Sequence, residues 1–324
     1  MILTTKESPW LQINQPVADY NVRQVAGASG IPLYWGRDSA GHYLFVVQLE
    51  GDHAKQFQKD GASVHGIDVD LREFESKHQG LVLTLEDQIN SDLFRGLCET
   101  MIASLRTVED HATALSVSLA HIKRWKAFLA GKKSRLLSPE EIRGLYGELL
   151  FFRYLYQDKL DQNSAVEAWG GPEGAHQDFI FQDSAVEVKA LSGKERSTVR
   201  ISSEDQLEAL CYNLYLVIYR LSELPGAERA LSLNGLVRAI EAELTEAEVI
   251  EAFFQRLSAY GYVEMVEYDR PEFVVKAHRA FRVDDEFPRL IRSRLPDGIV
   301  RLRYELKLET IGAFECDPAK IGEV

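Results

Sequence analysis

The segment HQDFIFQDSAVEVKA (residues 176–190) decides how the centre of this chain is interpreted. It reads as two short strands joined by a tight turn, because small runs of apolar residues lie on both sides of a polar pair. Strands of this apolar character belong in a core, yet Asp178, Glu187 and Lys189 lie within them. Three charged side chains within strands that belong in a core require a specific arrangement.

A turn centred on Gln182 and Asp183 places Asp178 opposite Glu187. Directly opposed residues of a hairpin point to the same side of the sheet, and alternate residues of one strand share a side. Asp178, Glu187 and Lys189 are therefore predicted to form one polar patch, with the apolar residues on the other face. The prediction depends on register, since a slip of one residue would move Asp178 to the opposite face.

This polar patch requires a compensating cation, because like charges placed opposite each other destabilise a sheet. Lys189 supplies part of the compensation. A divalent cation would supply it better, since Mg²⁺ is commonly held by one or two carboxylates together with substrate phosphates. A structural network of charges is the alternative interpretation.

A third carboxylate is predicted on the helix that precedes the hairpin. The sequence SPEE at 138–141 indicates a helix start with Ser138 as N-cap and Glu141 closing a capping box, and the helix extends to about Gln157. Glu148 falls within the apolar face of this helix, where burial without a partner is costly. We expect Glu148 to point at the same site as the strand carboxylates, the alternative being a salt bridge.

These residues together resemble the core of the PD-(D/E)XK nucleases. More closely, the chain resembles a bacterial family known as PD-(D/E)XK motif protein, through WGGP at 169–172, DF at 178–179, EVK at 187–189 and QL at 206–207. The resemblance extends over most of the chain. Gln177 stands where a proline is expected, and Ala190 stands where a small hydroxyl residue is frequent. No position of the catalytic set is missing.

The resemblance implies Mg²⁺-dependent hydrolysis of a phosphodiester, with Mn²⁺ as a substitute. The implied metal ligands are Asp178, Glu187, Glu148 and the backbone carbonyl of Val188. Lys189 would orient the attacking water and favour hydroxide by its charge. Gln206 matches a polar position that follows the core lysine in related nucleases, where it contacts substrate or metal, or only caps or packs.

Two basic segments are candidates for contacts with nucleic-acid phosphates, although the net charge of the chain is −13. The first lies in a stretch without acidic residues between Asp110 and Glu140, and its candidates are Lys123, Arg124, Lys126, Lys132, Lys133 and Arg135. The second contributes Arg292 and Arg294. Contacts of this kind position a duplex without reading its sequence. Ordinary solvated surface is the alternative for both segments.

The wider pattern predicts a mixed α/β chain with three domains. Residues 1–136 show strand patterns followed by two amphipathic helices. Residues 137–225 follow the order helix, strand, strand, helix, strand, which predicts a restriction-endonuclease-like core with a mixed sheet flanked by helices. Residues 226–324 show helices and then strands, which predicts an α+β domain that could be winged-helix-like.

Composition narrows the class of protein. The 324 residues are 45% hydrophobic and 27% charged, which is typical of a globular protein with more than one domain. No window approaches 18 apolar residues, and the N-terminus lacks the pattern of a signal peptide. The three cysteines are far apart and none has C-x-x-C spacing, so a cytoplasmic protein without a disulfide framework or a zinc cluster is expected.

The expected function is a metal-dependent DNA endonuclease, and the resemblance points to a bacterial restriction or phage-defence system with protein partners. Cutting both strands of a duplex needs two active sites, which favours a homodimer with two-fold symmetry. One alternative is a catalytically silent, nuclease-like subunit that binds DNA or acts as a scaffold in a defence complex. The other is a structure-specific repair nuclease.

Overall fold

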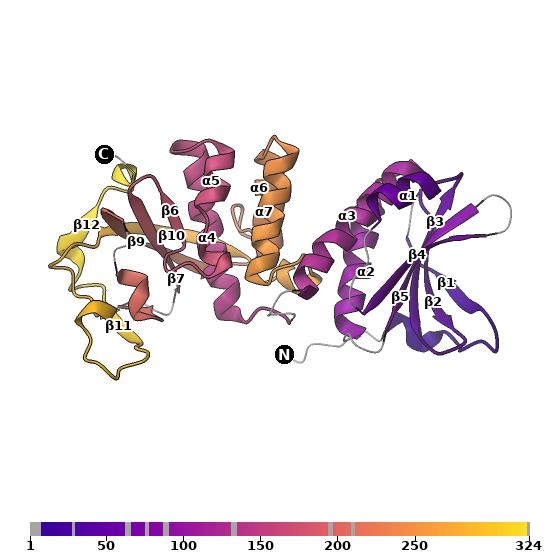
Figure 1. The fold of residues 1–324 in the computed structure, drawn as a ribbon, viewed down its shortest axis with the longest axis horizontal. Coiled ribbons are helices and arrows are strands. Elements are labelled where there is room, and N and C mark those ends of the chain that lie inside the picture. Colours follow the sequence, from indigo (N-terminus) through magenta and orange to yellow (C-terminus); the bar gives the residue numbers. More distant parts are fainter. Residues whose placement is uncertain are drawn as a thin grey trace. The chain divides into compact units, whose positions relative to one another are not determined.

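The computed structural model describes residues 8–27, 30–61, 66–74, 78–86, 91–130, 135–193, 197–208 and 211–322. The chain forms two compact units (Figure 1). The first comprises Met1–Arg135 with Val263–Val266, and the second comprises Leu136–Tyr262 with Glu267–Val324. The mixed α/β class predicted from the sequence is confirmed.

The first unit is an antiparallel sheet with helices, as its strand patterns and helical periodicity predict. Its five strands have the order β1-β2-β3-β5-β4, with bounds β1 (Tyr20–Gln24), β2 (Leu33–Asp38), β3 (Tyr43–Glu50), β4 (Ile67–Glu73) and β5 (His78–Leu85). The helices are α1 (Ala54–Asp60), α2 (Ser91–Leu105) and α3 (His111–Ala130), preceded by the 3-10 helix η1 (Pro9–Gln12). Trp10 is fully buried, and its indole N–H donates to the carbonyl of Leu44 at 2.8 Å.

The second unit contains a five-stranded mixed sheet with the order β12-β10-β9-β7-β6. Its strands are β6 (Phe179–Phe181), β7 (Ser184–Ser192), β9 (Asn213–Glu223), β10 (Phe273–Arg282) and β12 (Glu315–Cys316). β7 and β9 are parallel and the other neighbours are antiparallel. A separate two-stranded sheet pairs β8 (Thr198–Ile201) with β11 (Tyr304–Lys307).

Helices cover one face of this sheet. They are α4 (Pro139–Asp158), α5 (Gln162–Ala168), α6 (Leu233–Glu243) and α7 (Ala247–Tyr260). The capping box predicted for α4 is present, with Ser138 and Glu141 bonded to each other's backbone. Gly147 allows close approach of α4 to β7, since a Cβ there would lie 3.0 Å from the Cβ of Ala190.

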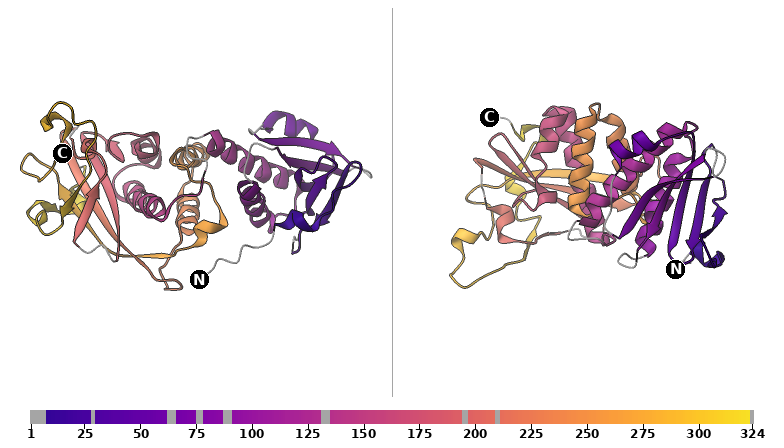
Figure 2. Two further views of the ribbon diagram at one scale, coloured as in Figure 1. Left: turned by 90° about the horizontal axis from the view of Figure 1, so that it is seen from below. Right: turned by 45° about the vertical axis from the view of Figure 1, so that its right-hand side comes forward.

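The other face of the sheet packs against the C-terminal segment. Figure 2 shows residues 284–314 on the side of the sheet away from α4 and α5. Ala185 and Leu191 of β7 share an apolar cluster on that side with Phe287 and Ile311. The short 3-10 helices of this unit are η3 (Gly171–Glu173), η4 (Glu204–Leu207), η5 (Val266–Asp269), η6 (Arg292–Arg294), η7 (Gly312–Phe314) and η8 (Pro318–Lys320).

The hairpin has the register that its sequence indicates. Phe181 pairs with Ser184 and Phe179 pairs with Val186, so the turn is centred on Gln182 and Asp183. Gln182 has a φ of 52°, which closes a two-residue turn. Glu187 and Lys189 therefore share one side of β7, as predicted, but the apolar Ala185 and Leu191 lie on that side too.

Residues 226–262 and 267–324, which fall within the predicted third domain, belong to the same compact unit as residues 137–225. The reason is β10, which pairs with β9 over most of its length and so lies inside the main sheet. An alternating strand pattern shows that a strand exists, but it does not show which sheet the strand joins. Within the described residues, no helix is both long enough and apolar enough to cross a membrane.

Candidate functional site

Asp178 lies at the edge of the sheet, immediately before β6. Its Oδ2 accepts a hydrogen bond from the backbone N–H of Val188 at 2.7 Å. If β6 extended further, a backbone carbonyl of that strand would accept this bond instead. Its own carbonyl accepts from the N–H groups of Gly170 and Gly171, both at 3.0 Å. The end of a short strand thus fixes this carboxylate beside Glu187 of β7.

Glu148 reaches the same place from α4. It is buried, as its position within the apolar helix face predicts, and its Oε2 accepts a hydrogen bond from the indole N–H of Trp169 at 2.8 Å. Trp169 is itself fully buried. The indole N–H of Trp169 orients the Glu148 carboxylate but, being neutral, does not compensate the negative charge of that carboxylate.

Gly171 lies between these two carboxylates. A Cβ at this position would lie 3.0 Å from Oδ1 of Asp178 and 3.1 Å from Oε2 of Glu148. The two oxygen atoms therefore converge on one point and are at most about 6 Å apart. Any side chain would have to displace one of them, so the second glycine of WGGP has a spatial role that the motif itself did not reveal.

Glu187 and Lys189 lie in the middle of β7, with alternation placing them on the side opposite Val188 and Ala190. The Nζ of Lys189 is 2.7 Å from Oε1 of Glu187, and the side chain of Glu187 is 1% exposed. Oε2 of Glu187 is buried and has no hydrogen-bond partner among the described residues. One oxygen of this carboxylate is thus compensated and the other is not.

Burial raises the pKa of all three carboxyl groups, and repulsion from Asp178 adds to the rise at Glu148 and Glu187. Burial and Asp178 together raise the pKa of Glu187 to about 8, against an opposing effect of Lys189. The pKa of Glu148 is well above its usual range because of burial and of Asp178. Burial also raises the pKa of Asp178, against the effects of Lys189 and the Val188 N–H. The single ammonium of Lys189 therefore does not compensate the negative charge of the three carboxylates.

Lys189 keeps its proton at neutral pH. Burial alone would lower its pKa, but the nearby carboxylates of Glu187 and Asp178 more than offset this and raise it. The ammonium also donates a hydrogen bond to Oε1 of Gln206 at 3.2 Å. Lys189 is therefore suited to act as a charge and a donor rather than as a neutral base.

Gln206, predicted near the site, is carried by η4 and held there from two sides. Its Oε1 also accepts from the N–H of Ser202 at 2.8 Å. The buried amide of Gln177 donates to the carbonyls of Asp205 at 2.9 Å and Glu208 at 3.0 Å, which links the residue before Asp178 to this loop. From the sequence, Gln177 was only a departure from an expected proline.

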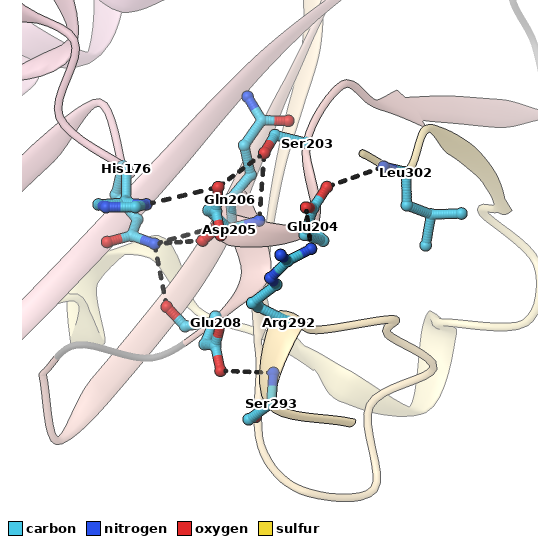
Figure 3. Close-up of polar contacts among 10 residues, drawn as sticks. His176, Ser203, Glu204, Asp205, Gln206, Glu208, Arg292, Ser293 and Leu302 are labelled. Atoms are coloured by element: carbon cyan, nitrogen blue, oxygen red, sulfur yellow. Dashed lines mark hydrogen bonds and ion pairs between the residues drawn. The ribbon is translucent and has the colours of Figure 1, made fainter. Parts of the chain in front are cut away.

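Arg292, a predicted phosphate contact, lies on the other side of the η4 loop (Figure 3). Its guanidinium is 3.4 Å from Oε1 of Glu204, whose side chain is 5% exposed, and Oε2 of Glu204 accepts from the N–H of Leu302 at 2.9 Å. Arg294 is 3.6 Å from Asp285, and both arginine side chains are at least half exposed. Arg292 thus stabilises the loop that carries Gln206.

The other predicted phosphate contacts belong to the first unit. Lys123 and Lys126 are exposed on α3, Arg124 is half-buried on the same helix, and Arg135 is exposed after it. Lys132 and Lys133 lie outside the described residues. The structure therefore brings together Glu148, Asp178, Glu187, Lys189 and Gln206, and it leaves these basic residues in a different unit.

The carboxylates fit a divalent cation that has few protein ligands. Within the described ranges, no group of three His, Cys, Asp or Glu side chains is close enough to hold a metal ion. Two carboxylates with an uncompensated buried oxygen nevertheless match the way Mg²⁺ is bound, since it keeps several waters and takes ligands from substrate phosphates. Glu148 suits an indirect contact better, because Trp169 already occupies its Oε2.

Comparison with known proteins gives one match. A family model described as "Putative PD-(D/E)XK family member, (DUF4420)" matches residues 6–309, which is nearly the whole chain. No curated protein and no solved structure matches the chain significantly.

Proposed function

The chain belongs to the PD-(D/E)XK-like family defined by that match, and from this premise we propose that it hydrolyses phosphodiester bonds of DNA with the help of a divalent cation. One observation carries the proposal. Glu187 is almost fully buried, and its Oε2 has no partner within the described residues. A buried carboxylate oxygen left in this state costs free energy that a bound cation would recover.

Asp178 and Glu187 would hold the cation, together with the backbone carbonyl of Val188. Glu148 would contact it directly or through water. Mg²⁺ is the proposed cation and Mn²⁺ a substitute, because both accept oxygen ligands. When bound, such an ion polarises the scissile phosphate and lowers the pKa of the attacking water.

Lys189 would act by charge and by donation. Because its pKa is raised, its ammonium would bind the attacking water or a phosphate oxygen, and would stabilise the negative charge that develops there. Gln206 would restrict the ammonium through the bond at 3.2 Å. The Val188 N–H fixes Asp178 through Oδ2, so its Oδ1 faces the point that it shares with Glu148.

A silent scaffold is the competing function, and one observation favours it. The described residues contain no three-residue metal cluster, and the contact between Lys189 and Glu187 already compensates part of the charge. In that case the site would be a structural charge network that binds no cation. A repair nuclease that acts on branched DNA would share the same chemistry and differ only in substrate.

Incubation of the purified protein with Mg²⁺ or Mn²⁺ and a panel of nucleic acids tests the proposal. The panel contains supercoiled plasmid, linear duplex, single-stranded and branched DNA, and RNA. We expect cleavage, and we expect Lys189→Met to lower its rate at least a hundredfold, since losing one donor that stabilises developing negative charge costs about 10²–10³ in rate. Equal activity of Lys189→Met and wild type would remove the assignment, and cleavage of branched DNA alone would favour the repair nuclease.

We also propose the biological setting from the resemblance alone. It comprises a bacterial restriction or phage-defence system in the cytoplasm, a homodimer for cuts in both strands, and protein partners. Light scattering with and without a duplex oligonucleotide tests the homodimer. A monomer in both conditions would contradict it.

A further inference from the structure

A cleft of about 510 Å³ lies at the carboxyl ends of two parallel strands in the second unit. β7 ends at Ser192 and β9 ends at Glu223, and both residues line the cleft. Crevices at the carboxyl ends of parallel strands are frequent ligand sites in α/β folds. The cleft is not part of the carboxylate cluster described above.

Arg143 of α4 lines this cleft and is poorly compensated. Its side chain is 15% exposed, and its Nε is buried without a hydrogen-bond partner among the described residues. Its guanidinium is 3.8 Å from Glu140, which is 75% exposed and so contributes little. A mostly buried guanidinium with so few acceptors is a ready binding site for an anion.

The rest of the lining suits a phosphate group. Ser192 and Ser222 contribute hydroxyl groups, and Gly193 permits their approach, since a Cβ there would lie 3.2 Å from Oγ of Ser222. Leu221 and Leu224 add apolar surface. Glu223 also lines the cleft, but it is exposed, so its carboxylate can turn to solvent.

The spacing relates the cleft to the proposed cleavage site. Arg143 and Glu148 are five residues apart on α4, which is about 7.5 Å along the helix axis. Ser192 and Lys189 are three residues apart on β7, which is about 10 Å. A DNA strand advances about 3.4 Å per nucleotide along its axis. Measured along the axes of α4 and β7, the offset between the two places therefore corresponds to two or three nucleotides.

We propose that Arg143, with the hydroxyl groups of Ser192 and Ser222, binds a backbone phosphate two or three nucleotides from the scissile one. The inference rests on the proposed nuclease function and adds a substrate contact to it. Arg143 would anchor the strand without reading bases, because phosphate contacts carry no direct sequence information. It would hold the scissile phosphate in register with Glu187.

Binding of fluorescein-labelled single-stranded and duplex 20-mers, measured by anisotropy over a range of salt concentrations, tests the inference. All proteins carry Lys189→Met, so that Mg²⁺ can be present while cleavage is suppressed. Adding Arg143→Gln is expected to raise Kd about tenfold and to reduce the slope of log K against log salt by about one. Arg143→Lys should keep the slope, since it keeps the charge.

Two controls separate this effect from loss of charge or of folding. Arg279→Gln removes a half-buried arginine that is paired with Glu315, and should leave the slope near that of the background protein. Leu224→Glu places a carboxylate in the cleft at a position that is 41% exposed, and should raise Kd where Leu224→Gln does not.

The outcomes distinguish this inference from the proposed function. Unchanged Kd and slope in Arg143→Gln and Leu224→Glu, with a background protein that binds DNA, would overturn the phosphate site alone. A background protein that binds none of the probes would overturn the site together with the proposed function. Equal losses in Leu224→Glu and Leu224→Gln would show a steric effect and would also contradict the site.

Discussion

Replacing Glu187 by glutamine is expected to stabilise the metal-free protein above neutral pH while it abolishes cleavage. The reason is the raised pKa of this buried carboxyl, about 8 against an ordinary value of 4.5. Between pH 4.5 and pH 8, Glu187 is protonated in the folded state and ionised in the unfolded state. The free energy of unfolding therefore falls as pH rises through this range. Glutamine resembles the protonated form and does not titrate.

The magnitude follows from the two pKa values. The stability that protonated Glu187 contributes is fully present below pH 4.5, and it is lost as pH rises through 8. Since each pH unit corresponds to about 1.4 kcal/mol, the loss is about 5 kcal/mol of unfolding free energy. Removing the charge of Glu187 also lowers the pKa of its neighbour Glu148, which adds to the difference between wild type and variant.

Urea denaturation in EDTA at pH 5 and pH 8.5 measures this difference. Wild type should lose more stability than Glu187→Gln between the two pH values, and Mg²⁺ should restore stability to wild type only. Glu228→Gln is the matched control, because Glu228 is exposed. If wild type and Glu187→Gln lose the same stability between pH 5 and 8.5, the argument from the buried carboxylate is refuted.

Three further substitutions test other parts of the site. Gly171→Ala should lower cleavage at least tenfold and unfolding free energy by about 1–3 kcal/mol, because its Cβ would crowd Asp178 and Glu148; wild-type rates would contradict this. Gln177→Leu should lower unfolding free energy by about 1–3 kcal/mol in urea titrations, because the carbonyls of the η4 loop lose the donor that Gln177 supplies; unchanged stability would contradict this role of Gln177. Arg292→Gln should cost at most about 1 kcal/mol, because Arg292 is half exposed, and a larger loss would contradict this.

The hairpin and the helix could be predicted because their signals are local. A two-residue turn determines which residues of β6 and β7 are opposed, and the period of α4 determines that Glu148 lies in its apolar face. Capping residues determine where α4 begins. These three features alone bring the carboxylates into one region.

The supporting contacts could not be predicted because they join residues far apart in the chain. Gln177 meets loop carbonyls 28 or more residues away, and Arg292 meets Glu204 at a separation of 88 residues. Neither residue has a sequence signal that names its partner. The place of β10 in the main sheet is likewise set by packing, since strand periodicity is the same in any sheet.

Binding of Mn²⁺ measured by electron paramagnetic resonance tests whether these buried carboxylates hold a divalent cation. Free Mn²⁺ is titrated with wild type and with Glu187→Gln, each shown to be folded by circular dichroism. Wild type is expected to bind Mn²⁺ saturably and more strongly at pH 8 than at pH 6, and Glu187→Gln is expected to lose this binding. Identical binding curves for the two proteins would contradict this expectation.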